Sequence, residues 1–167
     1  MEFILKNFDL KHGFSNHCLQ ATGFNHKLWA NIQRLDVQAY SSLTLDKLRK
    51  MNCETIQFEY LSEFSGTHLN EFIRYWLDGN MPKLRRFQLN YCFEHWTDDL
   101  WNGLPHAQCN PKRRKRFFYD GLEVVDCSEG RDIERSDGIL ATILVESKVL
   151  YFLIWHDRFP VDVRALF

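Results

Sequence analysis

The chain has 167 residues, of which 45% are hydrophobic, 15% aromatic and 26% charged. This composition is typical of a globular protein and excludes a disordered chain, and the length is that of roughly one domain of 100–200 residues. The 21 Lys and Arg residues nearly balance the 22 Asp and Glu residues, so the net charge of −1 gives no sign of a dedicated nucleic-acid or anionic-membrane binder.

Three strand-like segments begin near Ile32, Thr55 and Leu84, and the pattern predicts one helix in each interval between them. The intervals of 23 and 29 residues fall in the roughly 20–29-residue range of leucine-rich repeat units. In such units each repeat buries its apolar face against its neighbours. Residues 29–104 are therefore predicted to form an irregular leucine-rich-repeat-like stack of βα units.

The predicted helices have recognisable ends. Thr44 is the expected N-cap of a short helix whose apolar residues lie near one face: Leu45, Leu48 and Met51. In the next helix the apolar residues form the stripe of a core-facing helix, namely Leu69, Phe72, Ile73, Trp76 and Leu77. Ser65 or Thr67 is its expected N-cap and Gly79 its expected end. A further short helix is predicted over residues 96–104, with Thr97 as N-cap.

The last third of the chain is predicted to form an antiparallel β-meander over residues 117–157. Turn signals at Asp120-Gly121 and Asp137-Gly138 and a reversal at residues 146–148 separate the strands. The predicted strands cover residues 117–125, 131–135, 139–145 and 149–155. We expect an α/β fold in which the βα stack continues into this C-terminal antiparallel meander, within one domain over residues 1–167, since no linker-like segment is apparent.

The sequence also bears on location. No apolar run reaches the roughly 20 residues of a membrane span, and residues 1–9 lack the apolar centre of a signal peptide. Five unevenly spaced cysteines, Cys18, Cys53, Cys92, Cys109 and Cys127, fit a reducing compartment. We expect a cytoplasmic protein without membrane contact, with the nucleus as a further location.

Four blocks of residues, in order over about residues 29–155, together resemble a known family. They are Leu43-Thr44-Leu45-Asp46 with Met51-Asn52-Cys53 and Ile56; Leu69-Asn70 with Phe72-Ile73, Trp76, Gly79 and Pro82-Lys83-Leu84; Trp101-Asn102-Gly103-Leu104-Pro105; and Asp132-Ile133, Arg135, Asp137-Gly138 and Ala141-Thr142-Ile143. The family is the nematode F-box-associated domain, type 2. The resemblance implies recognition of a protein substrate for ubiquitination. Family members carry an upstream F-box that docks onto the adaptor of a cullin–RING ligase, whereas the 28 residues before Trp29 show no leucine-proline F-box opening. We expect either a standalone associated domain or a chain whose F-box lies elsewhere, and a link to the ligase only in the second case.

A run of five positive charges is the first candidate site: Lys112, Arg113, Arg114, Lys115 and Arg116, called here the basic run. It is typical of a nuclear-import signal or of a patch for phosphate or acidic partners, and equally of a solvated loop before a strand. Three aromatic residues around the predicted short helix, Phe93, Trp96 and Trp101, are interface anchors if they are exposed and core residues if they are buried.

The second candidate is a metal site. Cys92, His95, His106 and Cys109 follow the pattern C-x2-H-x10-H-x2-C, which suits tetrahedral zinc. The alternative is a chance grouping around a short helix, and the family resemblance supplies no metal motif there. We expect no cofactor.

No Walker loop, GxSxG, HExxH or GxGxxG motif occurs, and neighbouring His156 and Asp157 would point to opposite faces of a strand. We therefore predict a non-catalytic protein-interaction domain that binds a protein partner through a sheet edge or through loops at one rim of the stack. Two alternatives remain. One is a standalone binder that neutralises a partner without a ubiquitin ligase. The other is a nucleic-acid module that uses the basic run and shows steep salt dependence.

Overall fold

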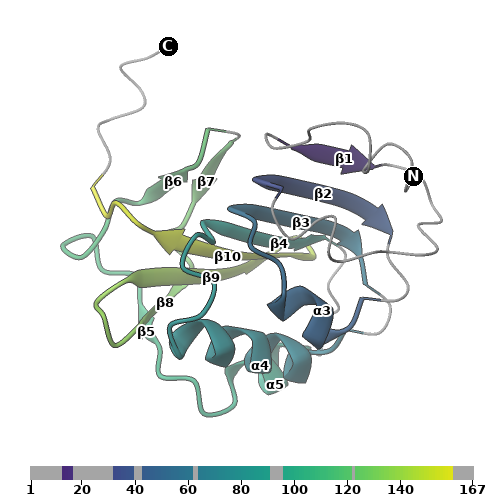
Figure 1. The fold of residues 1–167 in the computed structure, drawn as a ribbon. Helices are drawn as coiled ribbons and strands as arrows, with labels where there is room; N and C mark the ends of the chain where they lie inside the picture. Colours follow the sequence, from purple (N-terminus) through teal and green to yellow (C-terminus); the bar gives the residue numbers. More distant parts are fainter. Residues whose placement is uncertain are drawn as a thin grey trace.

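The computed structural model describes residues 13–16, 32–39, 43–61, 64–90, 96–121 and 123–159. Within these ranges, eight strands form one mixed sheet, with helices on one side of it (Figure 1). In spatial order the strands are β1 (Phe14–Asn16), β2 (Arg34–Ala39), β3 (Thr55–Tyr60), β4 (Arg86–Asn90), β10 (Val149–Trp155), β9 (Leu140–Glu146), β8 (Arg131–Glu134) and β5 (Ala107–Gln108). The helices are α3 (Leu45–Arg49), α4 (Gly66–Leu77) and α5 (Trp96–Trp101), and a separate hairpin consists of β6 (Phe117–Tyr119) and β7 (Val124–Asp126). The α/β prediction is confirmed.

Strands β1 to β4 form the parallel half of the sheet. Helix α3 lies between β2 and β3 in the chain, and α4 lies between β3 and β4, as parallel neighbours require a crossover connection. The register places Leu35, Ile56 and Phe87 side by side, and all three are fully buried. The three predicted strands therefore exist within two residues of their expected starts, whereas the closer likeness to leucine-rich repeats stays a prediction.

The caps of α3 and α4 are those that the sequence predicts. The Thr44 hydroxyl accepts a hydrogen bond from the Lys47 backbone N–H at 3.4 Å, and Ser65 does the same for His68 at 3.4 Å. His68 Nδ1 in turn accepts the Ser65 backbone N–H at 3.2 Å, so histidine takes the place that Glu or Gln occupies in an ordinary capping box. Gly79 follows α4 with φ of +90°, a conformation that favours glycine.

The main core lies between the helices and the sheet and joins both halves of the sheet. The Trp76 ring on α4 meets Phe152 of β10 edge-on at 5.2 Å, and Phe72 contacts Phe87 of β4 at 4.9 Å. The amphipathic stripe of α4 is thus buried across the junction of the parallel and antiparallel strands. Burial of these large apolar side chains is the main source of stability in this part of the fold.

The antiparallel half consists of β5, β8, β9 and β10, and the last three of these follow one another as a meander. Its last strand, β10, pairs with β4, so the chain returns to the middle of the sheet and places Phe152 beside Phe87. The predicted reversal between β9 and β10 is a two-residue turn in which Ser147 and Lys148 have φ of 49° and 68°. A turn whose two central residues both lie in this left-handed region is typical of a type I′ hairpin.

The hairpin β6–β7 packs on the sheet face opposite the helices. Phe118 of β6 meets Trp155 edge-on at 5.1 Å, and both belong to a second buried cluster with Val125, Cys127, Leu140, Leu144 and Leu153. The turn signal at Asp120-Gly121 is confirmed, since Gly121 has φ of +88° between β6 and β7. The prediction of one unbroken strand over residues 117–125 is therefore wrong. Thr97 is not an N-cap either, since α5 already begins at Trp96. None of the helices in the described ranges is long and apolar enough to cross a membrane.

Candidate partner-binding surface

The basic run is not a uniform positive surface, because Arg114 is fully buried. Its Nε donates to both carboxylate oxygens of Asp132 at 2.9 and 3.1 Å, and Nη2 donates to the Cys127 carbonyl at 2.9 Å. The guanidinium also lies over the Trp155 ring, with Cζ 5.0 Å from its centre. Thr142 Oγ1 links Asp132 and Trp155, since it donates to Asp132 at 2.7 Å and accepts from Trp155 Nε1 at 2.8 Å. Arg114 therefore fixes the hairpin to the sheet and contributes no surface.

Two other members of the run form ion pairs inside the chain. Arg116 donates to both oxygens of Asp126, and these hydrogen bonds hold the pKa of Asp126 well below its usual range. The Glu134 carboxylate pairs with both Arg113, at 2.5 Å, and Arg158, at 2.8 Å. The hydrogen bond from Arg158 is the largest cause that lowers the pKa of Glu134, and the hydrogen bond from Arg113 is the next largest. Arg113 and Arg116 therefore each already face a carboxylate of the same chain.

Lys112 and Lys115 are the exposed lysines of the run. Trp101 is half-buried against the main core; its ring lies 4.7 Å from His106 and 4.7 Å from the guanidinium of Arg131. Phe93 and the side chain of Trp96 lie outside the described part of the structure. A partner contact through the basic run or these aromatic residues stays a prediction.

Of the four predicted zinc ligands, the structure describes only His106 and Cys109. Cys92 and His95 lie outside the described residues. His106 Nδ1 lies 2.9 Å from the Leu104 carbonyl, and its Nε2 lies 3.2 Å from Arg131. Within the ranges that the structure describes, no three His, Cys, Asp or Glu residues group closely enough to hold a metal ion.

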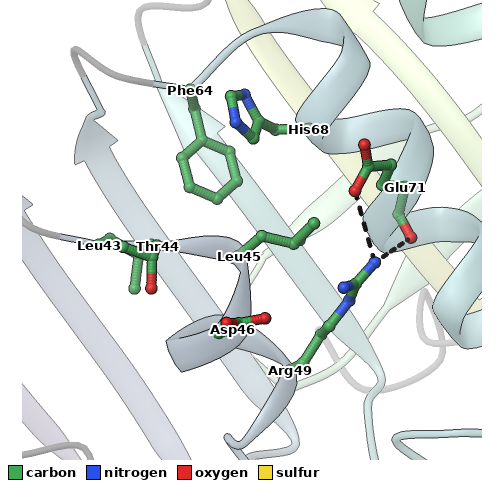
Figure 2. Close-up of a pocket in the computed structure, with 8 residues that line it drawn as sticks. All are labelled: Leu43, Thr44, Leu45, Asp46, Arg49, Phe64, His68 and Glu71. Carbon is green, nitrogen blue, oxygen red and sulfur yellow. Dashed lines mark hydrogen bonds and ion pairs between the residues drawn. The ribbon is translucent and has the colours of Figure 1, made fainter.

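A cavity of about 350 Å³ lies between α3 and α4 (Figure 2). It is called here the α3–α4 pocket, and its lining residues are Leu43, Thr44, Leu45, Asp46, Arg49, Phe64, His68 and Glu71. The three apolar members are buried and form its base, whereas Thr44, Asp46 and Glu71 are exposed. The lining comes from α3, from the first half of α4 and from the segments before both helices. The pocket therefore lies at the carboxyl ends of β2 and β3, where open α/β sheets commonly bind their ligands.

The two helices are fixed to each other at one side of the pocket. Arg49 Nη2 donates to the Glu71 carbonyl at 3.4 Å and lies 3.7 Å from its carboxylate, as the dashed lines in Figure 2 mark. The same guanidinium lies over the Tyr75 ring at 5.2 Å, and the Tyr75 hydroxyl lies 3.5 Å from the Arg49 carbonyl. The pocket is therefore a preformed feature with an apolar base and a charged rim. Such a site suits one or two side chains of a partner.

Sequence reasoning missed this pocket, although it identified both helix caps. The signal was the pair Thr44 and Ser65, 21 residues apart, each at the start of a helix that follows a parallel strand. Two successive βα units place both helix starts at the same rim of the sheet. The loops at one rim were an expected interface, but the specific residues predicted for it lie elsewhere.

The motif blocks, in contrast, hold the fold together. Asn70 Nδ2 donates to the carbonyls of Leu100 and Asn102 at 2.7 and 2.9 Å, and thus satisfies the C-terminal end of α5. Trp76 lies beneath the guanidinium of Arg135 at 4.9 Å, and Arg135 pairs with Asp137 at 2.7 Å in the turn before β9. Residues of separate blocks therefore contact one another, and their role is architectural.

Comparison with known proteins supports this family relationship. The model of the family described as F-box associated matches residues 23–89. Three uncharacterized proteins of Caenorhabditis elegans are similar to 80%, 80% and 78% of the chain, at 30%, 25% and 24% identity over 148, 145 and 131 residues. The matches span 33%, 33% and 38% of these relatives, so the chain corresponds to about a third of their length. No solved structure gives a significant match.

All residues that line the α3–α4 pocket fall inside the matched segment. Over residues 23–89, the chain matches the model of the F-box-associated family.

Proposed function

We propose that this chain is a non-catalytic protein-interaction domain and that it binds its partner at the α3–α4 pocket. The observation that carries the proposal is the position of the pocket: a preformed cavity lies wholly within the F-box-associated segment. A protein-interaction role is what that family suggests, and the pocket is a place where the role can be performed.

The chemistry of the pocket supports protein binding. Leu45 and Phe64 offer an apolar base that a partner side chain can cover, and water leaves that base on binding. Asp46 and Glu71 stand at the rim, where charged groups give specificity more than affinity. In many protein interfaces a few side chains that fill such a pocket, inside a polar rim, contribute most of the binding energy.

We also propose that this domain acts as the substrate-recognition part of a ubiquitin ligase. The family match supports this role, and the greater length of the relatives leaves room for a ligase-docking segment. The alternative is a binder that neutralises its partner without ubiquitin. Affinity capture of the native full-length protein, followed by mass spectrometry, separates the two. Recovery of cullin and its adaptor with a specific protein supports the ligase role, and a stoichiometric partner without ligase components overturns it.

The binding site itself is tested by a matched pair of substitutions on α3. Asp46→Trp places a large side chain at the mouth of the pocket, whereas Lys50→Trp places one at an exposed position at the end of the same helix. We expect the first variant to lose at least 90% of the captured partner and the second to keep it. Circular dichroism verifies that both remain folded. Equal capture by both variants would overturn the assignment of the pocket.

A further inference from the structure

We propose that the occupant of the α3–α4 pocket is an arginine side chain in an exposed segment of the partner protein. This inference rests on the proposed function and adds to it the chemistry of the partner. Three features of the pocket carry it: its apolar base, its excess of carboxylates, and the prior engagement of its own cation.

The base of the pocket suits a long side chain with a charged end. Leu43, Leu45 and Phe64 are buried residues that turn apolar atoms toward the cavity (Figure 2). Arginine covers such surface with its methylene stem and keeps its guanidinium at the polar rim.

The rim carries two carboxylates on different helices, Asp46 on α3 and Glu71 on α4. Both are exposed, and within the described ranges Asp46 makes no ion pair. The rim histidine, His68, lies with Nδ1 3.2 Å from the Ser65 backbone N–H, which it accepts in the capping box of α4. The lining thus carries two carboxylates, those of Asp46 and Glu71, against one guanidinium, that of Arg49.

Arg49 is already engaged by α4, although 30% of its side chain is exposed. Its guanidinium lies over the Tyr75 ring and donates to the Glu71 carbonyl, so it is already held by α4. An acidic or phosphorylated segment would meet the carboxylates of Asp46 and Glu71, and the one guanidinium among the lining residues, that of Arg49, is already in contact with α4. A guanidinium, in contrast, can pair with the Asp46 carboxylate through two parallel hydrogen bonds.

The test uses blocked pentapeptides of sequence Gly-Ser-X-Ser-Gly, titrated into the 15N-labelled chain of 167 residues. X is arginine, citrulline (neutral and nearly isosteric), lysine or glutamate. We expect the arginine peptide to shift amide signals of residues 43–49 and 64–71, and to bind at least fivefold more tightly than the citrulline peptide. Asp46→Asn should weaken the arginine peptide at least threefold, whereas Asp78→Asn, at the opposite end of α4, should leave it unchanged.

Equal affinity for arginine and citrulline, tighter binding of the glutamate peptide, or shifts confined to other segments would overturn the inference. The outcome is separable from that of the proposed function. If Asp46→Trp abolishes capture of the natural partner while arginine and citrulline bind alike, the pocket is the binding site and the arginine chemistry is wrong. If Asp46→Trp leaves capture intact, the site itself is wrong.

Discussion

Replacement of Arg114 should destabilise the protein far more than replacement of its neighbours in the basic run. Arg114→Met keeps much of the volume of the side chain but removes the charge and its hydrogen bonds to Asp132 and to the Cys127 carbonyl. Asp132 is 3% exposed, so its carboxylate would remain buried with the Thr142 hydroxyl as its described side-chain donor. Removing one partner of a buried ion pair costs about 3–5 kcal/mol, a large share of the roughly 5–15 kcal/mol that keeps a typical domain folded.

Urea unfolding followed by tryptophan fluorescence measures this difference. Lys112→Met and Lys115→Met are the matched controls, since both residues are exposed, and exposed substitutions usually change stability by less than about 0.5 kcal/mol. The double variant Arg114→Met, Asp132→Leu should recover part of the loss, because it removes the uncompensated charge as well. An Arg114→Met variant as stable as Lys115→Met would refute the reasoning that this arginine anchors the hairpin.

Three further predictions concern other parts of the molecule. Gly130→Ala should destabilise the fold by about 1–3 kcal/mol in the same urea assay, because its Cβ would lie 2.3 Å from Cγ2 of Thr142, a side chain fixed by its hydrogen bonds; an unchanged midpoint would contradict this. Hydrogen bonds from Arg135 lower the pKa of Asp137 from 3.8 to about 2, so the stabilisation is complete above pH 3.8 and is lost as the pH falls toward 2. The urea midpoint should therefore decrease more between pH 6 and pH 2.5 for the wild type than for Asp137→Asn. An equal decrease for both proteins would count against the ion pair. Burial raises the pKa of the Cys53 thiol to about 12, so iodoacetamide at pH 8 should label it only after unfolding, as peptide mapping can check.

The parts of the fold that sequence predicts well are those set by local interactions. Helix α4 has its N-cap at Ser65, its apolar stripe and its terminal Gly79 within 15 residues, and all three occupy the expected places. The strands at β2, β3 and β4 are short apolar runs with punctuation on both sides, and they too lie where the pattern indicates. The pairing of β4 with β10 joins residues about 60 positions apart, and no local pattern specifies which strand is the neighbour.

The same distinction explains the candidate sites. The sequence of five positive residues is the same whether their side chains are solvated or buried. The acidic partner of Arg114, Asp132, lies 18 residues away on β8, so no local pattern indicates that this arginine is buried. The pocket depends on how far α3 and α4 stand apart, which packing decides and periodicity does not. Sequence therefore indicated the family and the cap residues Thr44 and Ser65, whereas the cavity between the two helices emerged only from the tertiary structure.

The central claim is that a protein partner binds at the α3–α4 pocket. Hydrogen–deuterium exchange of the chain, alone and with the partner recovered by affinity capture, tests it most directly, because it compares all surfaces at once. The account predicts slower exchange in the complex at residues 43–49 and 64–71, with residues 112–116 unchanged. Protection confined to residues 112–116, with the two helices unaffected, would contradict it and would assign the interface to the basic run.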